Sequence, residues 1–283
     1  MRLEGRRTSS NVDDRRGIGG AKATLGIGGV ILAVVITWLM GGNPLDVLTS
    51  QLADVTQVGT EYKPSAKDDA MALFASQILA GTEDVWTKEF EKMGRRYVPP
   101  KMVLFSRAVS SGCGSTSSQT GPFYCPADQT VYIDLSFFDQ MKNQLGAGGD
   151  FAYAYVIAHE VGHHVQYLLG TLNQVQQKQS RANKNESNRL SVRLELQADF
   201  YAGIWAYHDH QMYNSLEPGD IEKGLNAASA IGDDRLQMQS QGYTVPDAFN
   251  HGTSAQRVRW LKKGATTGKV ANGDTFSMDY AAL

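Results

Sequence analysis

The sequence predicts an α+β fold that is predominantly helical, with a small sheet near the N-terminal end of the domain and a single transmembrane helix before it. Three observations support this. Apolar residues recur at helical spacing through most of the chain after residue 67. Two segments with β-type composition, 101–109 and 129–135, precede the longest helical patterns. An uncharged apolar run, 23–43, comes before all of them.

The bulk composition indicates one substantial domain with no sign of a nucleic-acid partner. The chain has 283 residues, 42% of them hydrophobic, and a formal net charge of −2. Basic residues gather only before the apolar run, where they form either an RNA-binding arm or a signal that orients a membrane segment. Their position beside a hydrophobic run favours membrane orientation. They are Arg2, Arg6, Arg7, Arg15, Arg16 and Lys22.

The apolar run 23–43 is long enough to cross a hydrocarbon core of about 30 Å as a helix. Trp38 lies near one end, where interfacial aromatic residues are common. A retained anchor, a cleaved signal peptide and a buried core helix all remain open. The length of the run and the lack of a nearby A-x-A cleavage site favour the anchor.

The flanks of this run predict its orientation. After the basic residues, no further Lys or Arg occurs until Lys63, so the positive-inside rule places the N-terminus in the cytoplasm. We therefore expect residues 1–22 to be a basic cytoplasmic tail without a fold and 23–43 to be a single-pass anchor. Residues 44–66, interrupted by Pro and Gly, read as a linker, and 67–283 as the exported domain.

The chain has two cysteines, Cys113 and Cys125, which flank a Gly/Ser-rich stretch. Two are too few for a disulfide-stapled miniprotein or a cysteine-rich zinc finger. In an oxidising compartment they would form one short-loop disulfide, and in a reducing one they would remain thiols. The predicted export favours the disulfide.

The domain is expected to contain several long helices. The first spans 68–93, with an interruption near Gly81. The second begins at Asp150 as its N-cap and ends at Leu169, closed by Gly170. Later helices are expected at 188–207, at 217–241 and after Ser254.

The strongest chemical signal is His159-Glu160-Val161-Gly162-His163, an H-E-x-x-H motif inside the second of these helices. Residues four apart share a helical face, so His159 and His163 can bind one metal ion. Imidazole nitrogens suit zinc. Glu160 lies beside them and is placed to take a proton from metal-bound water. A pair of packed or solvated histidines is the structural alternative.

A catalytic zinc needs a third protein ligand, and the best candidate is Glu195 on the next long helix. A histidine at the spacing of the elongated H-E-x-x-H-x-x-G-x-x-H motif is absent, because Gln166 and Leu169 stand there. Asp199 lies four residues after Glu195, so it can accept a hydrogen bond from a ligand histidine. A solvated Glu195 that pairs with an arginine of its own helix is the alternative.

Five segments together resemble the bacterial "putative neutral zinc metallopeptidase" family, with a gluzincin-like arrangement. The resemblance implies a zincin-like fold, bound Zn²⁺ and a single-pass anchor. With the orientation argument, it places the protein in the bacterial inner membrane, with the catalytic domain on the periplasmic, extracytoplasmic side. The segments are AHEVGHHVQ, ELQADFYAG, GRRTSSNVDDRRG, CGSTSSQTGPFYCPADQTVYIDLSFFD and HGTSAQRVRW.

His251 is the remaining candidate for a catalytic role. Zincins often use a histidine or tyrosine from a later segment to stabilise the oxyanion, and His251 precedes the last helix. The alternative is a loop histidine beside a helix cap. Zincins also pair an edge strand with extended substrate, and either 129–134 or 101–105 is expected to be that strand. His164, His208 and His210 are expected to be structural.

The predicted activity is zinc-dependent hydrolysis of a peptide bond in a peptide or protein substrate. His159, His163 and Glu195 hold the zinc, Glu160 acts as the general base, and Asp199 orients a ligand. The competing hypothesis is a catalytically inactive, membrane-tethered binding or scaffold protein with the same fold. Retention of Glu160 argues against it, because a structural zinc needs no base.

Overall fold

The computed structural model describes residues 1–17, 64–117 and 120–283. Its central sheet has the strand order β1-β2-β6-β5, in which the first three strands are parallel and β5 is antiparallel to β6. A separate hairpin pairs β3 with β4. The strands are β1 (Val12–Asp14), β2 (Lys101–Phe105), β3 (Ala108–Ser111), β4 (Gly114–Ser117), β5 (Phe123–Cys125) and β6 (Thr130–Asp134).

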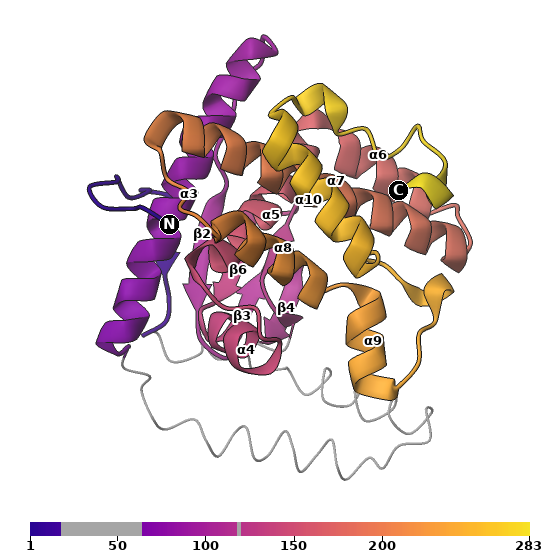
Figure 1. Cartoon of the computed structure of the whole chain (residues 1–283), viewed down its shortest axis with the longest axis horizontal. Coiled ribbons are helices and arrows are strands. Elements are labelled where there is room, and N and C mark those ends of the chain that lie inside the picture. Colours follow the sequence, from indigo (N-terminus) through magenta and orange to yellow (C-terminus); the bar gives the residue numbers. More distant parts are fainter. Residues whose placement is uncertain (18–63, 118–119) are drawn as a thin grey trace.

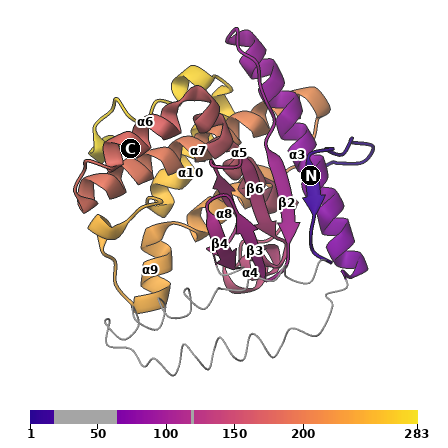
Figure 2. The same cartoon turned by 180° about the vertical axis from the view of Figure 1, so that it is seen from behind.

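Helices cover one side of this sheet and form most of the molecule (Figures 1 and 2). The central helix α5 packs against α3, α7 and α8, and α10 lies along α7. The helices are α3 (Ala66–Lys92), α4 (Ser136–Gln144), α5 (Asp150–Leu169), α6 (Thr171–Gln179), α7 (Lys184–Tyr213), α8 (Asp220–Ala230), α9 (Asp233–Gln241) and α10 (Ser254–Thr267).

Successive side chains of the inner strand β2 point to opposite faces of the sheet, and a separate apolar cluster lies on each face. Met102 and Leu104 of β2 join the main core with α3 and α5. Val103 and Phe105 point to the opposite face, where they pack with Tyr132 and the hairpin side of the sheet. Both faces of β2 are therefore buried, which explains why the strand is a nearly continuous apolar run.

The helix that carries the H-E-x-x-H motif has the predicted length and end. It runs from Asp150 to Leu169, and Gly170 closes it in the left-handed conformation with φ 85°. The predicted N-cap was wrong by one residue, because Gly149 occupies that position and Asp150 is the first helical residue.

Two other helix predictions need correction. The helix through Gly81 is continuous, and a Cβ there would lie 2.8 Å from the side chains of Arg6 and Asp209, so this glycine permits a close contact. The segment expected as one helix over 217–241 is two, α8 and α9, separated at Ile231 and Gly232.

The N-terminal residues differ most from expectation. Residues 1–17 were predicted to lack a fold, yet β1 pairs in parallel with β2, with Val12 opposite Met102. Because β1 covers one side of β2 and β5 covers one side of β6, the two predicted edge strands, 101–105 and 129–134, are inner strands. Among the described strands, β1 and β5 form the edges of the central sheet.

The predicted anchor, 23–43, lies outside the described residues, as does nearly all of the predicted linker, 44–66. At the end of that linker, Ser65 is already the N-cap of α3 and forms a capping box with Asp68. Within the described part of the chain, no helix is both long and apolar enough to cross a membrane.

Candidate metal centre

The site forms where α5 and α7 approach closely. Gly162 faces Ala198, and a Cβ on Gly162 would lie 3.0 Å from the Ala198 carbonyl oxygen. A larger residue would push the helices apart. These two small residues therefore permit the close packing that brings side chains of the two helices to one point.

Three side chains meet there, His159 and His163 from α5 and Glu195 from α7. Their ligand atoms all lie within 4.8 Å of one another. His159 Nε2 is 3.1 Å from Glu195 Oε2, and His163 Nε2 is 3.4 Å from Glu195 Oε1. The structure thus brings together the three residues that the sequence nominated as ligands.

The outer nitrogen of each histidine has its own acceptor. His159 Nδ1 donates to Asp199 Oδ1 at 2.8 Å, and His163 Nδ1 donates to Gln166 Oε1 at 2.9 Å. An Nδ1–H that is donated to these acceptors leaves Nε2 as the atom that faces Glu195, and its lone pair would bind a metal ion once Nε2 has lost its proton. Asp199 therefore occupies the place predicted for it.

Gln166 is held in the orientation that this hydrogen bond needs. Its amide nitrogen donates to the Leu194 carbonyl oxygen at 2.7 Å and to Gln197 Oε1 at 3.1 Å, so its oxygen is left to accept from His163. Gln197 is itself fixed by donating to the Gly273 carbonyl oxygen at 2.8 Å. The hydrogen-bonded side-chain amides of Gln197 and Gln166 thus fix the orientation of the His163 ring.

Asp199 is fully buried and is held by Arg257 of α10. The Arg257 guanidinium donates to both Asp199 oxygens at 2.9 Å, and the Tyr155 hydroxyl donates to Oδ1 at 2.5 Å. Arg257 also donates to the Tyr155 oxygen at 3.1 Å. Every member of this buried group has a charged or polar partner, as such burial requires.

The charges of the site favour a cation at its centre. Burial lowers the pKa of His159, but Asp199 and Glu195 outweigh it and raise that pKa to about 10. Burial raises the pKa of Glu195, but His163 and His159 hold it well below its usual value. Two carboxylates beside the ligand histidines thus stabilise positive charge, which a divalent metal ion also supplies.

The donor set fits zinc. Two imidazole nitrogens and one carboxylate are a common catalytic set, with a fourth position left for water. Tetrahedral ligands at about 2.0–2.1 Å from zinc lie roughly 3.3 Å apart, close to the observed 3.1 and 3.4 Å separations.

The family profile described as "Putative neutral zinc metallopeptidase" matches residues 1–276. The chain belongs to this family.

Two relatives show how far the likeness extends. "Uncharacterized protein YpfJ" of Escherichia coli (strain K12) is 51% identical over 294 aligned residues, which cover 98% of this chain and 99% of that protein. "Uncharacterized protein Rv2575" of Mycobacterium tuberculosis (strain ATCC 25618 / H37Rv) is 48% identical over 191 residues, 64% of each chain. No solved structure matches the chain.

The two residues expected to act on substrate are Glu160 and His251. Glu160 follows His159 in α5 and is mostly buried at 8% exposure. Its charge contributes to the raised pKa of His163. His251 precedes α10 and its side chain is 50% exposed. Burial lowers the pKa of His251, but Asp233 and then Glu195 outweigh it and raise that pKa.

Asp233 positions His251 from α9. One carboxylate oxygen accepts the backbone N–H groups of Asn250, His251 and Gly252, at 2.7–3.0 Å. The other lies 3.2 Å from His251 Nδ1. Asp233 therefore fixes both the backbone and the ring of His251. It does so through Nδ1, so Nε2 is not bonded to this carboxylate.

The other histidines have structural partners. His164 is fully buried, accepts from the Tyr124 hydroxyl at 2.9 Å and donates to the Val98 carbonyl oxygen at 2.7 Å. Burial lowers its pKa to about 4. His208 donates to the Gly268 carbonyl oxygen, and His210 accepts from the Leu216 backbone.

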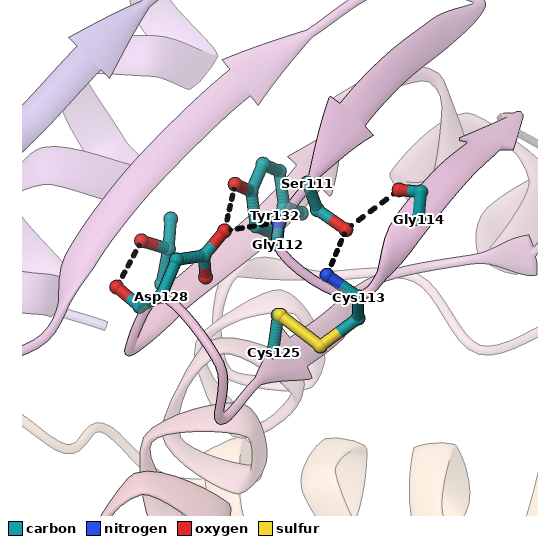
Figure 3. The surroundings of a disulfide bond; sticks show 8 residues. Ser111, Gly112, Cys113, Gly114, Cys125, Asp128 and Tyr132 are labelled. Atoms are coloured by element: carbon teal, nitrogen blue, oxygen red, sulfur yellow. Dashed lines mark hydrogen bonds between the residues drawn. A yellow bond between two sulfur atoms is a disulfide. The ribbon is translucent and has the colours of Figure 1, made fainter.

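The disulfide lies at the edge strand β5 (Figure 3). Cys113, in the β3–β4 turn, is bonded to Cys125, the last residue of β5. Asp128 holds the same region, because its Oδ2 accepts from the Gly112 N–H at 2.6 Å and the Tyr132 hydroxyl at 2.7 Å. The hairpin is thus tied to the strand whose Tyr124 touches the motif helix.

Sequence reasoning missed Gln166, Tyr155 and Arg257 as members of the site. Gln166 and Tyr155 stand three residues after His163 and four before His159, on the helical face of the ligands, so spacing alone could have nominated them. Arg257 offered no such signal, because it comes from a helix far along the chain.

Proposed function

We propose that this protein is a zinc-dependent peptidase that hydrolyses peptide bonds. The observation that carries the proposal is the convergence of His159, His163 and Glu195, with Glu160 adjacent and each ligand histidine fixed from behind. Family membership supports it. A bound zinc ion would acidify a water molecule and polarise the substrate carbonyl.

The other catalytic roles would fall to residues of the chain. His159, His163 and Glu195 would hold the ion, with Asp199 and Gln166 fixing the ring orientations. Glu160 would accept the proton of the attacking water and later deliver it to the leaving amine. His251, held by Asp233, would donate a hydrogen bond from its free nitrogen to the developing oxyanion.

The substrate backbone would bind along β5. This strand is an edge of the central sheet, and its Tyr124 is hydrogen-bonded to His164, the residue after the second ligand. Extended peptides add to such edges through main-chain hydrogen bonds. This placement replaces the expectation that 101–105 or 129–134 pairs with substrate.

Variants of the site residues distinguish this proposal from the competing hypothesis of a catalytically inactive scaffold protein with the same fold. We expect one zinc per chain in the purified protein, and a severe loss of zinc in His159→Ala, His163→Ala and Glu195→Ala. Glu160→Gln should keep zinc and lose peptide hydrolysis, because it removes a base and no ligand. Metal analysis and turnover of a peptide library are the measurements.

Two results would count against these roles. Loss of zinc in Glu160→Gln would make it a ligand or a structural residue. Stoichiometric zinc in the unmodified protein, without turnover of any peptide, would favour the scaffold.

We further propose that the domain works outside the cytoplasm. The Cys113–Cys125 disulfide supports this, because disulfides form and persist in oxidising compartments.

A further inference from the structure

The first residues of the chain form a strand of the domain. We define residues 1–17 as the N-terminal segment. Its β1 lies in register with β2, and two main-chain hydrogen bonds flank the pairing, Met102 N–H to the Asn11 carbonyl oxygen at 2.9 Å and Arg15 N–H to that of Leu104 at 2.8 Å. Without it, β2 would have an unpaired edge.

Ion pairs bind the N-terminal segment to helices far along the chain. Arg6 donates to both carboxylate oxygens of Asp209 in α7, at 2.7 and 3.3 Å. The Arg6 side chain is 10% exposed and that of Asp209 is fully buried. A buried carboxylate needs such a partner, so undocking would leave a costly unpaired charge at Asp209.

Polar contacts with α3 extend this attachment. Arg7 pairs with Asp84 at 2.6 Å, and the Ser9 hydroxyl donates to Glu83 at 2.5 Å. Glu83 is mostly buried. The basic residues that suggested a cytoplasmic orientation signal thus have another explanation, since Arg2, Arg6, Arg7 and Arg16 each pair with a carboxylate of the domain.

The chain leaves the described structure and returns to it at one place on the surface. Arg16, next to the last described residue of the segment, lies 3.1 Å from Asp69 in the first turn of α3. In Figures 1 and 2 the start of α3 is at the lower side of the molecule. The sequence between these points, residues 18–63, includes the uncharged run 23–43.

A single membrane crossing between these points is incompatible with the folded sheet. It would put a hydrocarbon layer of about 30 Å between β1 and β2, whose backbones are hydrogen-bonded. We infer that the N-terminal segment and residues 64–283 lie on the same side of the membrane. This inference is independent of the metal site.

Cysteine labelling in cells tests the inference. Glu4→Cys reports on the N-terminal segment and Tyr243→Cys on the domain, because both residues are exposed. Each variant is treated with a membrane-impermeant maleimide in intact spheroplasts and after permeabilisation. The unmodified chain, with its two native cysteines, gives the background, and denatured samples give full labelling.

We expect both positions to react under the same condition, either both in intact spheroplasts or both only after permeabilisation. The condition also identifies the side of the membrane. Reaction of one position in intact spheroplasts and of the other only after permeabilisation would overturn the inference and restore the single-pass orientation.

Discussion

Asp199 is the residue on which the buried contacts of the site converge. Burial raises its pKa, but Arg257 and then His159 outweigh burial and lower it. Asp199 thus stays ionised and accepts from His159, Tyr155 and Arg257 together. The spacing of Asp199 from Glu195 predicted the first of these contacts. The contact with Arg257 depends on how α10 packs, which no local spacing encodes.

We predict that Arg257→Gln weakens zinc binding and destabilises the fold. Without the guanidinium, the Asp199 carboxylate loses its permanent cation and holds His159 less firmly. Zinc affinity should fall roughly 10–100-fold, as for other residues that orient a ligand. Chelator competition measures the affinity, and thermal unfolding the stability.

Arg259→Gln is the matched control, because Arg259 is on the same helix, is exposed and bonds only to carbonyl oxygens near residue 283. Equal zinc affinities in both variants would show that Arg257 does not act through the ligand.

Close helix contacts bring α10 to the site. Gly203 and Gly264 face each other, and a Cβ on either would overlap the backbone of the other helix. Gly203 stands one turn after Asp199, and Gly264 about two turns after Arg257, so the glycines lie on the faces that carry these residues. The periodicity of apolar residues predicted both helices. It did not predict their approach, which depends on two residues without side chains.

Strand prediction shows a different limit. The inner strands β2 and β6 were expected because they are apolar runs of usual length. β1 was not, because VDD has no apolar alternation and its pairing comes from the free edge of β2. The basic residues beside β1 were therefore interpreted as a membrane-orientation signal. The structure instead pairs them with carboxylates of the domain.

We predict that Arg6→Ala destabilises the protein by about 3–5 kcal/mol, because it leaves the carboxylate of Asp209 buried without its partner. Arg2→Ala is the control, since Arg2 is 58% exposed and its pair with Glu217 is worth about 0–1 kcal/mol. Denaturant unfolding of the full chain measures both. If the two variants unfold alike, the N-terminal segment is not docked on the domain in solution.

At the scale of the whole molecule, the candidate metal centre and the disulfide lie on different parts of the fold. The centre is built from α5, α7 and α10, whereas the disulfide joins the hairpin to β5. The sequence predicted both residue pairings, because each depends on residues close in sequence or on a known spacing. It did not predict that β5, which carries Cys125, also contacts the motif helix, through the Tyr124 hydroxyl and His164.

We predict that Cys113 and Cys125 in the protein from cells resist alkylation until a reductant is added. In the chain-entropy description, a disulfide that closes a short loop contributes about 3 kcal/mol, and here the sequence separation is 12. Replacing both cysteines with serine should lower the free energy of unfolding by a similar amount and leave zinc content unchanged. Free alkylation without reductant would argue against an oxidising compartment.

The contact between Arg6 and Asp209 also sets an order of events during synthesis. Their positions differ by 203 residues. At about 5–20 residues per second, a ribosome makes Asp209 roughly 10–40 s after Arg6. The run 23–43 therefore emerges, and can meet targeting factors, well before β1 has a partner. Any factor that recognises this run would meet a chain that has not folded, and the nascent β1 must stay free of other strands until β2 and α7 exist.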